Sequence, residues 1–276
     1  SEMCIRDRDY VFIFILKWGM FGAALATSLG YIVGAVMILA YLFHPERILH
    51  VCRVKLSKKS LYLTIRNVGY MCRLGFSSFL CETAIATMMF VGNYVFIRYL
   101  GEDGVAAYSI ACYFFPIVFM VYNAIAQSAQ PILSYNYGAK CTARVRETFR
   151  LALTTAILCG AGVFLLTWIF SHQIVGMFLD SSYPAYNIAV KGLPLFASGF
   201  VFFGINIVSI GYFQSLERDC PAMIITLLRG FALILLCFWI LPIIWGSWGI
   251  WLAVPMSELL TFLFVLVIYW LENRRN

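Results

Sequence analysis

Trp18-Gly-Met-Phe-Gly-Ala-Ala-Leu-Ala26 and Trp245-Gly-Ser-Trp-Gly-Ile-Trp-Leu-Ala253 share one pattern, W-G-x-x-G-x-x-L-A. Each copy opens an apolar run that is long enough to cross a bilayer. Internal repeats are typical of secondary transporters, in which two similar halves move around a shared central site. The pattern therefore predicts that the chain begins with the last helix of one repeat and ends with the last helix of another.

The composition is that of a membrane protein. Hydrophobic residues make up 62% and charged residues 12% of the chain, and the mean hydropathy is +0.86. A soluble domain carries about 25% charged residues, and a helix needs roughly 20 apolar residues to cross the hydrocarbon core. We therefore predict an all-α polytopic membrane protein with seven transmembrane helices, at 18–43, 70–99, 105–128, 151–170, 188–213, 222–244 and 248–271.

The Lys and Arg residues predict the orientation. Fourteen of them fall on one side of the predicted spans, including those of 45–73 and 138–150, and three fall on the other. Cytoplasmic loops carry the excess of basic residues, so the carboxyl terminus is expected in the cytoplasm and the chain in a bacterial inner membrane. The net charge of +7 then reflects a basic face near anionic lipid, and no nucleic-acid partner is expected.

The two W-G-x-x-G-x-x-L-A helices point the same way, because an even number of crossings separates them. Parallel repeats indicate two six-helix lobes related by an axis along the membrane normal. The predicted division is a non-native leader at 1–8, the last helix of a truncated amino-terminal lobe at 9–44, a basic cytoplasmic connector at 45–69, the carboxyl-terminal six-helix lobe at 70–271 and a cytoplasmic tail at 272–276.

Signatures of catalysis and metal binding do not occur in the sequence. The nine cysteines are scattered without a C-x-x-C pair, and no H-E-x-x-H, G-x-S-x-G or phosphate-binding glycine loop is found. We therefore expect neither an enzyme nor a bound cofactor, and the sequence gives no metal site.

Two carboxylates fall inside predicted spans. Glu82 lies in the 70–99 run and Glu258 near the middle of the 248–271 run, where an ionised carboxylate costs about 2.5–3.5 kcal/mol. By helical spacing, polar residues share a face with each other on three spans. We expect these faces to look inward, where they either line a wet cavity or join helices by hydrogen bonds. The three faces are Ser78, Glu82 and Asn93; Asn123, Gln127 and Gln130; and Ser198, Asn206 and Ser209.

Arg229 is a further charge inside a predicted span, 222–244. Its long side chain could reach the cytoplasmic headgroups. Alternatively, it could pair with a carboxylate of another helix.

Several segments resemble the multidrug and toxic compound extrusion (MATE) family. Gln130-Pro-Ile-Leu-Ser-Tyr-Asn-Tyr-Gly-Ala139 resembles that family's Q-P-x-x-S-Y-N-Y-G-A signature. Gly22-Ala-Ala-Leu-Ala-Thr27 resembles the start of its sixth helix, Tyr212-Phe-Gln-Ser-Leu216 the end of its tenth, and Trp248-Gly-Ile-Trp-Leu-Ala253 the start of its twelfth. The resemblance implies that the seven runs are equivalent to helices 6–12 of a twelve-helix, two-lobe transporter.

The resemblance implies a secondary antiporter that exports organic, often cationic, compounds in exchange for Na⁺ or H⁺ by alternating access. Its partners would be small organic substrates, the lipid bilayer and the missing amino-terminal lobe. Glu82 matches a cation-site glutamate of some members, and we expect Ser78 and Asn93 to assist it in ion coupling. The 188–213 run lacks the aspartate of some sodium-coupled members, so the coupling ion is open. The expected substrate cavity comprises Asn123, Gln127, Gln130, Asn206, Ser209 and Glu258.

Two other functions compete with this interpretation. A lipid-linked oligosaccharide flippase of the same superfamily would need a basic cavity, of which the spans show little besides Arg229. A seven-helix sensor or receptor would not explain the parallel repeat, and the last span lacks a lysine that could hold a retinal.

The charge asymmetry yields a first test. A cysteine placed at Ser57 should be labelled only from the cytoplasmic side, and a reporter fused after Asn276 should report the cytoplasm, because fourteen basic residues are assigned to that side. Labelling of position 57 in intact cells by a reagent that cannot cross the membrane would refute the predicted topology.

Overall fold

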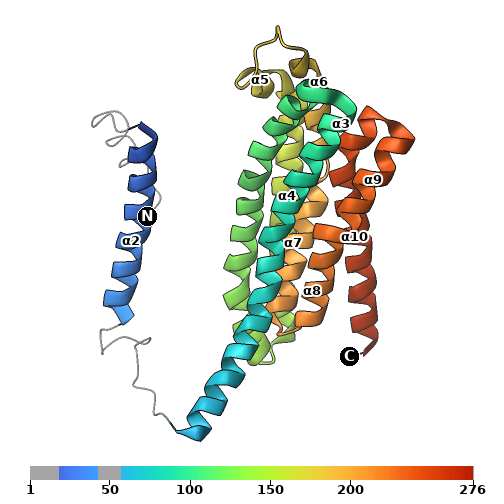
Figure 1. The fold of residues 1–276 in the computed structure, drawn as a ribbon. Coiled ribbons are helices and arrows are strands. Elements are labelled where there is room, and N and C mark those ends of the chain that lie inside the picture. Colours follow the sequence, from blue (N-terminus) through green and yellow to red (C-terminus); the bar gives the residue numbers. More distant parts are fainter. Residues whose placement is uncertain (1–18, 43–56, 276) are drawn as a thin grey trace. The chain divides into compact units, whose positions relative to one another are not determined.

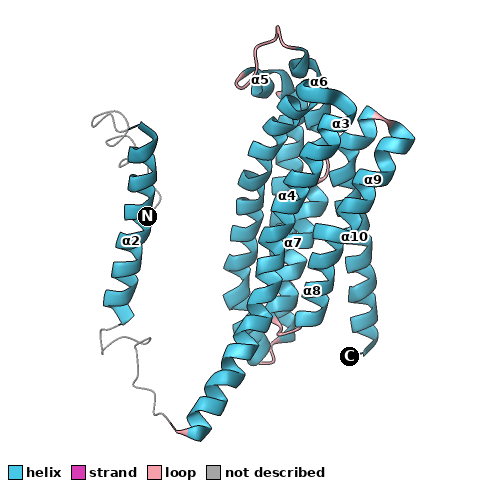
Figure 2. Ribbon diagram, in the orientation of Figure 1, coloured by secondary structure: helices cyan, strands magenta, loops and turns pink. Residues whose placement is uncertain are grey.

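The computed structural model describes residues 19–42 and 57–275, and every regular element among them is a helix (Figures 1 and 2). The predicted leader at 1–8 lies outside the described residues. The chain forms two units, Ser1–Arg66 and Asn67–Asn276, and α2 (Gly19–Leu42) belongs to the first. The other helices are α3 (Lys58–Gly138), α4 (Thr142–Ile169), α5 (Ser171–Gly176), α6 (Pro184–Ala197), α7 (Phe200–Ser215), α8 (Asp219–Leu227), the π-helical η2 (Leu228–Ala232), α9 (Leu233–Trp245) and α10 (Ser247–Arg275).

Helix α3 consists of two antiparallel legs joined at Gly101. That glycine has φ 68° and ψ −158°, a conformation that side chains other than hydrogen rarely allow. The Tyr108 ring stacks on Phe96 with ring centres 4.3 Å apart, and the Tyr108 hydroxyl donates a hydrogen bond to the Met88 carbonyl. The chain therefore reverses at Gly101 (Figure 1), and the predicted 70–99 and 105–128 runs are the two legs.

The seven predicted runs coincide with helices, although a simple count of long apolar helices is smaller. Among the described residues, four helices are long and apolar enough to span a membrane, or five if the bent α6–α7 pair is one span. The count is smaller for two reasons. Phe79–Gly138 contains both legs of α3, and the apolar stretch of α2 among the described residues, Ser28–Tyr41, is shorter than a full span. The fold class predicted from the sequence, an all-helical lobe of a transporter, is confirmed.

The α6–α7 pair forms one bent span at the predicted 188–213 run. Its two helices meet at an angle of 41°, next to Pro194, which cannot donate a backbone hydrogen bond. A Cβ atom on Gly199 would lie 2.8 Å from Cα of Pro255 in α10. The bend therefore brings the backbones of α7 and α10 into direct contact at a position that only glycine fits.

The second W-G-x-x-G copy forms the tight turn between α9 and α10. Gly246 has a φ of 57° and ends α9. A Cβ atom on Gly249 would collide with the backbone of Leu241 and would lie 3.1 Å from the Pro242 nitrogen. The first glycine thus permits the reversal, and the second lets the two helices approach closely.

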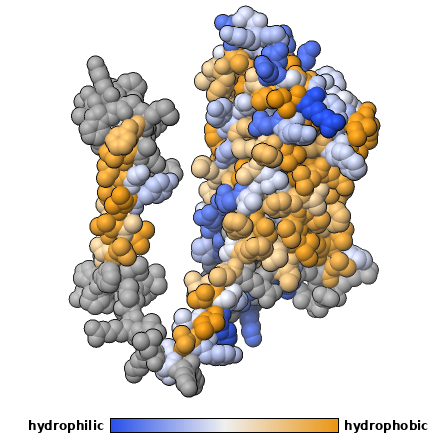
Figure 3. Space-filling view, in the orientation of Figure 1, coloured by the Kyte–Doolittle hydropathy of each residue, from blue (hydrophilic) through white to orange (hydrophobic). Residues whose placement is uncertain are grey.

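The interior of the lobe is aromatic. Tyr122 is fully buried, donates a 2.8 Å hydrogen bond to the Phe200 carbonyl and packs against Gly160 and Gly204. The outer surface in this view is also largely apolar, with hydrophilic residues at the end that carries α5 and in smaller patches on the side and at the opposite end (Figure 3). Because lipid tails are as apolar as these side chains, close packing and hydrogen bonds, rather than burial alone, hold the helices together.

We expect Gly249→Ala to lower the free energy of unfolding by about 1–3 kcal/mol, because the added methyl group would force the α9 backbone to move. Thermal unfolding of the detergent-purified chain would measure it. Gly162→Ala is the matched control: it lies within α4 with no atom near its would-be Cβ, and it should be neutral or stabilising by up to about 1 kcal/mol. Equal effects of the two changes would contradict the close approach.

Candidate functional site

A buried cluster of polar side chains joins three segments of the lobe. Nε of Arg229 in η2 donates to Oε1 of Glu258 in α10 at 2.8 Å. Nδ2 of Asn206 in α7 donates to Oε2 of the same carboxylate at 2.8 Å and to the Glu258 carbonyl at 3.0 Å. Arg229 and Glu258 are each 4% exposed, and Asn206 is fully buried. Both carboxylate oxygens of Glu258 therefore have a donor.

Local backbone geometry places Arg229 in this cluster. Leu228–Ala232 is a π-helical turn between α8 and α9, and such turns occur frequently at functional sites. The next residue, Gly230, packs so closely on Ala84 of α3 that a Cβ atom there would collide with the Ala84 methyl group. The turn thus directs the guanidinium towards α10 while the backbone approaches α3.

Arg229 makes two further contacts that fix its side chain. Its Cζ lies 4.5 Å from the ring centre of Phe203, a cation–π contact. Its Nη1 lies 3.8 Å from Sγ of Cys81 in α3. Of the two alternatives that the sequence left open, the structure therefore has Arg229 paired with a carboxylate inside the lobe, not extended to the headgroups.

Two polar atoms of this region are buried without a hydrogen-bond partner among the described residues. They are Oδ1 of Asn206 and Oγ of Ser209, both on α7. An unsatisfied buried polar atom costs about 1–3 kcal/mol. A cavity of about 10 Å³, roughly the room for one water molecule, lies beside Arg229 and Glu258. The cluster therefore contains hydrogen-bonding atoms beyond those that the ion pair uses.

Glu82 lies outside this cluster, on the exposed surface of the lobe. The depth of Glu82 in the bundle follows from the residue before it. Cys81 contacts Arg229, which lies near the middle of the Cys220–Trp245 span. Glu82 is therefore an exposed carboxylate close to the middle depth of the bundle. The Ser78 side chain lies outside the described part of the structure. Asn93 is half-buried, and its Nδ2 donates to the Met89 carbonyl of its own helix at 2.9 Å.

The remaining predicted residues lie at different places. Asn206 and Glu258 are brought together, and Ser209 is buried one turn after Asn206. On the second leg of α3, Asn123 is half-buried and Gln127 is exposed. Gln130 is half-buried, and its Nε2 donates to Oε1 of Gln214 in α7 at 3.2 Å. The assignment of these residues to a substrate cavity stays a prediction.

Sequence reasoning missed the Gln214 partner, the Phe203 and Cys81 contacts and the π-helical turn. Gln214 could have been found, since it lies in the Y-F-Q-S-L segment that carries part of the family resemblance. The π-helical turn leaves no mark in the hydrophobic pattern. In residues 19–42 and 57–275, no three His, Cys, Asp or Glu side chains come together as a metal site.

The arrangement separates two kinds of charge. Arg229 neutralises Glu258 within the lobe, so this pair is fixed and electrically balanced. Glu82 is exposed at a depth where a charge cannot face lipid cheaply, and intramembrane acids of that kind face a partner helix or a water-filled cavity. An all-helical lobe with a balanced internal ion pair and an exposed acid at middle depth is typical of a membrane transporter.

Comparison with known proteins gives the family. The MatE family model matches residues 78–239, more than half of the chain, and the chain belongs to this family of multidrug and toxic compound extrusion (MATE) transporters. Multidrug export protein MepA of Staphylococcus saprophyticus is 21% identical over 267 residues, and MepA of Staphylococcus aureus strain NCTC 8325 is 21% identical over 271. Each match covers 96% of this chain and 57% of the relative, so the chain spans little more than half the length of these relatives.

Solved structures of transporters share the fold. An outward-facing multidrug resistance MATE family transporter of the MOP superfamily superposes with a TM-score of 0.82 at 20% identity, over 96% of this chain and 59% of that one. A variant of the Vibrio cholerae MATE transporter VcmN gives a TM-score of 0.83 at 19% identity, over 99% of this chain and 60% of that one.

The buried pair can be tested by a double-mutant cycle. Arg229→Met and Glu258→Met should each lower the free energy of unfolding by about 3–5 kcal/mol, because each leaves an unpaired charge or donor in the interior. The double variant should recover most of that loss. Thermal unfolding in detergent would measure all three. Arg98→Met, at an exposed position, should change stability by less than about 0.5 kcal/mol. A double variant as unstable as the sum of its singles would contradict the pairing.

Proposed function

We propose that the chain is the carboxyl-terminal lobe, with one helix of the other lobe, of an antiporter that exports organic cations in exchange for Na⁺ or H⁺. The family assignment supports export, since two curated relatives are described as multidrug export proteins. The observation that carries the proposal is the position of Glu82, an exposed acid at middle depth of an otherwise apolar surface.

Glu82 is the coupling acid in this proposal. Facing lipid would cost a charged carboxylate about 2.5–3.5 kcal/mol, so the surface around Glu82 is expected to face the other lobe across a wet cavity. A proton or Na⁺ taken up there cancels the charge and favours one orientation of the two lobes. An organic cation competes for the same charge, and this competition links import of the ion to export of the substrate.

Asn93 and Ser78, on the same leg of α3, assist Glu82 in this proposal by supplying polar groups to the ion. Asn123, Gln127 and Gln130 line the route of the substrate on the second leg. Glu258, Asn206 and Ser209 lie buried inside the lobe, behind this polar wall, and the ion pair with Arg229 keeps the lobe rigid while the two lobes move.

The alternative functions have weaker support. Membership of a transporter family favours transport over a seven-helix sensor. For a flippase of lipid-linked sugars, the cavity would need free basic groups among the spans, but the guanidinium of Arg229 is already neutralised by Glu258. The surface acid Glu82 also suits a cationic substrate better than an anionic one.

Glu82→Gln should abolish gradient-driven efflux of a fluorescent organic cation, because the amide keeps the shape of the side chain and cannot carry the coupling charge. The measurement is dye efflux from proteoliposomes that contain the two-lobe protein, under an imposed Na⁺ or H⁺ gradient. Glu102→Gln, which removes an exposed acid beside the Gly101 turn, is the matched control and should retain efflux. Undiminished efflux by Glu82→Gln would refute the coupling role.

A further inference from the structure

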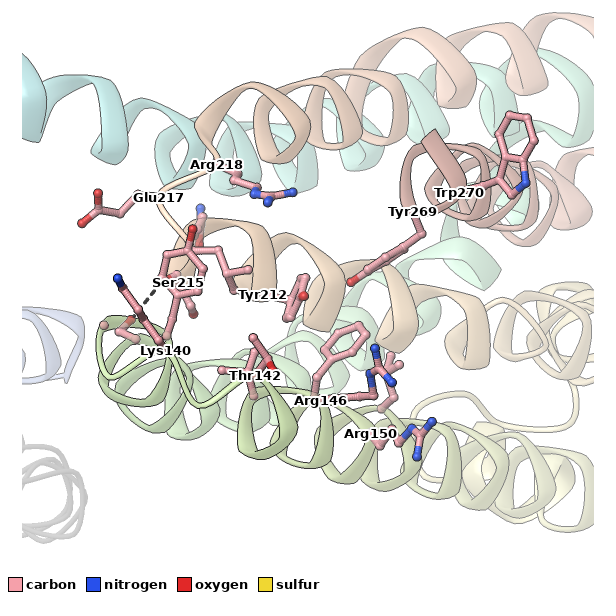
Figure 4. Close-up of a pocket in the computed structure, with 18 of the residues that line it drawn as sticks. Lys140, Thr142, Arg146, Arg150, Tyr212, Ser215, Glu217, Arg218, Tyr269 and Trp270 are labelled. Carbon is pink, nitrogen blue, oxygen red and sulfur yellow. Dashed lines mark hydrogen bonds between the residues drawn. The ribbon is translucent and has the colours of Figure 1, made fainter. Parts of the chain in front are cut away.

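A large pocket lies at the end of the lobe opposite α5, where the α3–α4 and α7–α8 connections meet the last turns of α10 (Figures 1 and 4). Its volume is about 1480 Å³. This end carries the basic residues that the charge asymmetry assigns to the cytoplasm. The pocket is separate from the Arg229–Glu258 pair and from Glu82, neither of which lines it.

The pocket wall is strongly basic. Lys140 from the α3–α4 turn, Arg146 and Arg150 from α4, and Arg218 from the turn before α8 line it, and Glu217 is the acid among the lining residues whose side chains the structure describes. In Figure 4, Arg146 and Arg150 project from the same face of α4, and Arg218 lies across the pocket from them. Among the described residues, Lys140, Arg146 and Arg150 have no ion-pair partner. An anion beside Arg146 and Arg150 would therefore meet two unneutralised cations at once.

The helix ends around the pocket add to this positive charge. Arg146 lies near the start of α4, and Arg218 directly precedes α8. The amino-terminal end of a helix carries a partial positive charge, so a cation there is unfavourable and an anion favourable. The placement of these arginines thus opposes the helix dipoles, and a bound anion would relieve the repulsion.

The other part of the wall is aromatic. Phe149 of α4 packs against Tyr212 of α7, with ring centres 4.3 Å apart, and against Tyr269 of α10, at 5.6 Å. Trp270, about half exposed, lies at the rim (Figure 4). Tyr and Trp gather at the level of the headgroups. A ligand with an anionic head and an apolar stem matches such a wall better than a purely polar anion does.

We propose that this pocket binds the phosphate headgroup of an anionic phospholipid from the cytoplasmic leaflet. The phosphate lies against Arg146 and Arg150, and the start of the acyl chains lies along the cluster of Phe149, Tyr212 and Tyr269. Lys140, at the other end of the pocket in Figure 4, adds to its positive charge. Basic pockets between transmembrane helices on the cytoplasmic side recognise such headgroups. The bound lipid ties α4, α7 and α10 together at an end of the lobe where the backbone connections are short.

Lipid binding by the 276-residue chain purified in detergent tests the proposal. Native mass spectrometry would measure the dissociation constants for phosphatidylglycerol and for phosphatidylcholine. Phosphatidylglycerol should bind at least tenfold more tightly. The double variant Arg146→Gln/Arg150→Gln should weaken the binding of phosphatidylglycerol by about 30-fold, since each basic residue near the headgroup contributes about 1 kcal/mol. Both residues are exposed, so the fold should be retained.

Arg98→Gln/Arg144→Gln is the matched control, with the same loss of charge at exposed positions that do not line the pocket. It should weaken the binding of phosphatidylglycerol by less than about threefold. Equal losses in the two double variants, or equal binding of the two lipids by the unaltered chain, would overturn the proposal.

Inorganic phosphate, added as a competitor, distinguishes the two sources of the anion. If the lipid is the ligand, millimolar phosphate should leave phosphatidylglycerol bound. Displacement at that concentration would overturn the lipid assignment in favour of a free-phosphate site. Displacement by an acidic peptide, but not by phosphate, would overturn it in favour of a protein partner.

Discussion

The ion pair between Arg229 and Glu258 is the constraint around which the lobe is arranged. Neither charge could remain in the interior of the bundle alone, because the cost of leaving one unpaired exceeds that of most single contacts in a protein. Pairing them requires η2 and α10 to lie side by side, and the two Asn206 hydrogen bonds bring α7 to the same place. Gly199 makes the approach of α7 to α10 sterically possible, and Gly230 lets the η2 backbone pack closely on Ala84 of α3.

Much of this fold could be predicted from the sequence, since a bilayer leaves few choices. The apolar runs identified the helices, although α3 begins at Lys58 and ends at Gly138, about ten residues beyond the predicted runs at each end. The W-G-x-x-G pattern marked a turn that both of its glycines are needed to form. The reversal between the 70–99 and 105–128 runs was predicted, but neither its position at Gly101 nor the 41° bend between α6 and α7 was, because hydrophobicity reports length and apolar character but not the dihedral angles at a single residue.

The candidate site could be predicted only in part from the sequence. Helical spacing identified Asn206 and Glu258 as polar residues inside spans, but it cannot say which helices are neighbours, so their hydrogen bond was not foreseen. The polarity of the face formed by Ser78, Glu82 and Asn93 led us to expect that it looks inward, although helical spacing by itself gives no direction. In the structure, Glu82 is on the outer surface, and Asn93 bonds to its own helix. Whether these residues couple an ion depends on what that surface faces, and a one-lobe sequence pattern does not contain this information.

The π-helical turn at Leu228–Ala232 has a consequence for how related chains should be compared. Such a turn holds one residue more than the α-helical turn it replaces. Each residue of an α-helix rotates the next side chain by about 100°, so a relative that is one residue shorter here would present a different side chain to α10. A single gap in an alignment at this segment therefore marks the loss or relocation of the pair to Glu258, even where the flanking sequences agree. The identity of the residue that aligns with Arg229 would not by itself reveal that the pair is lost.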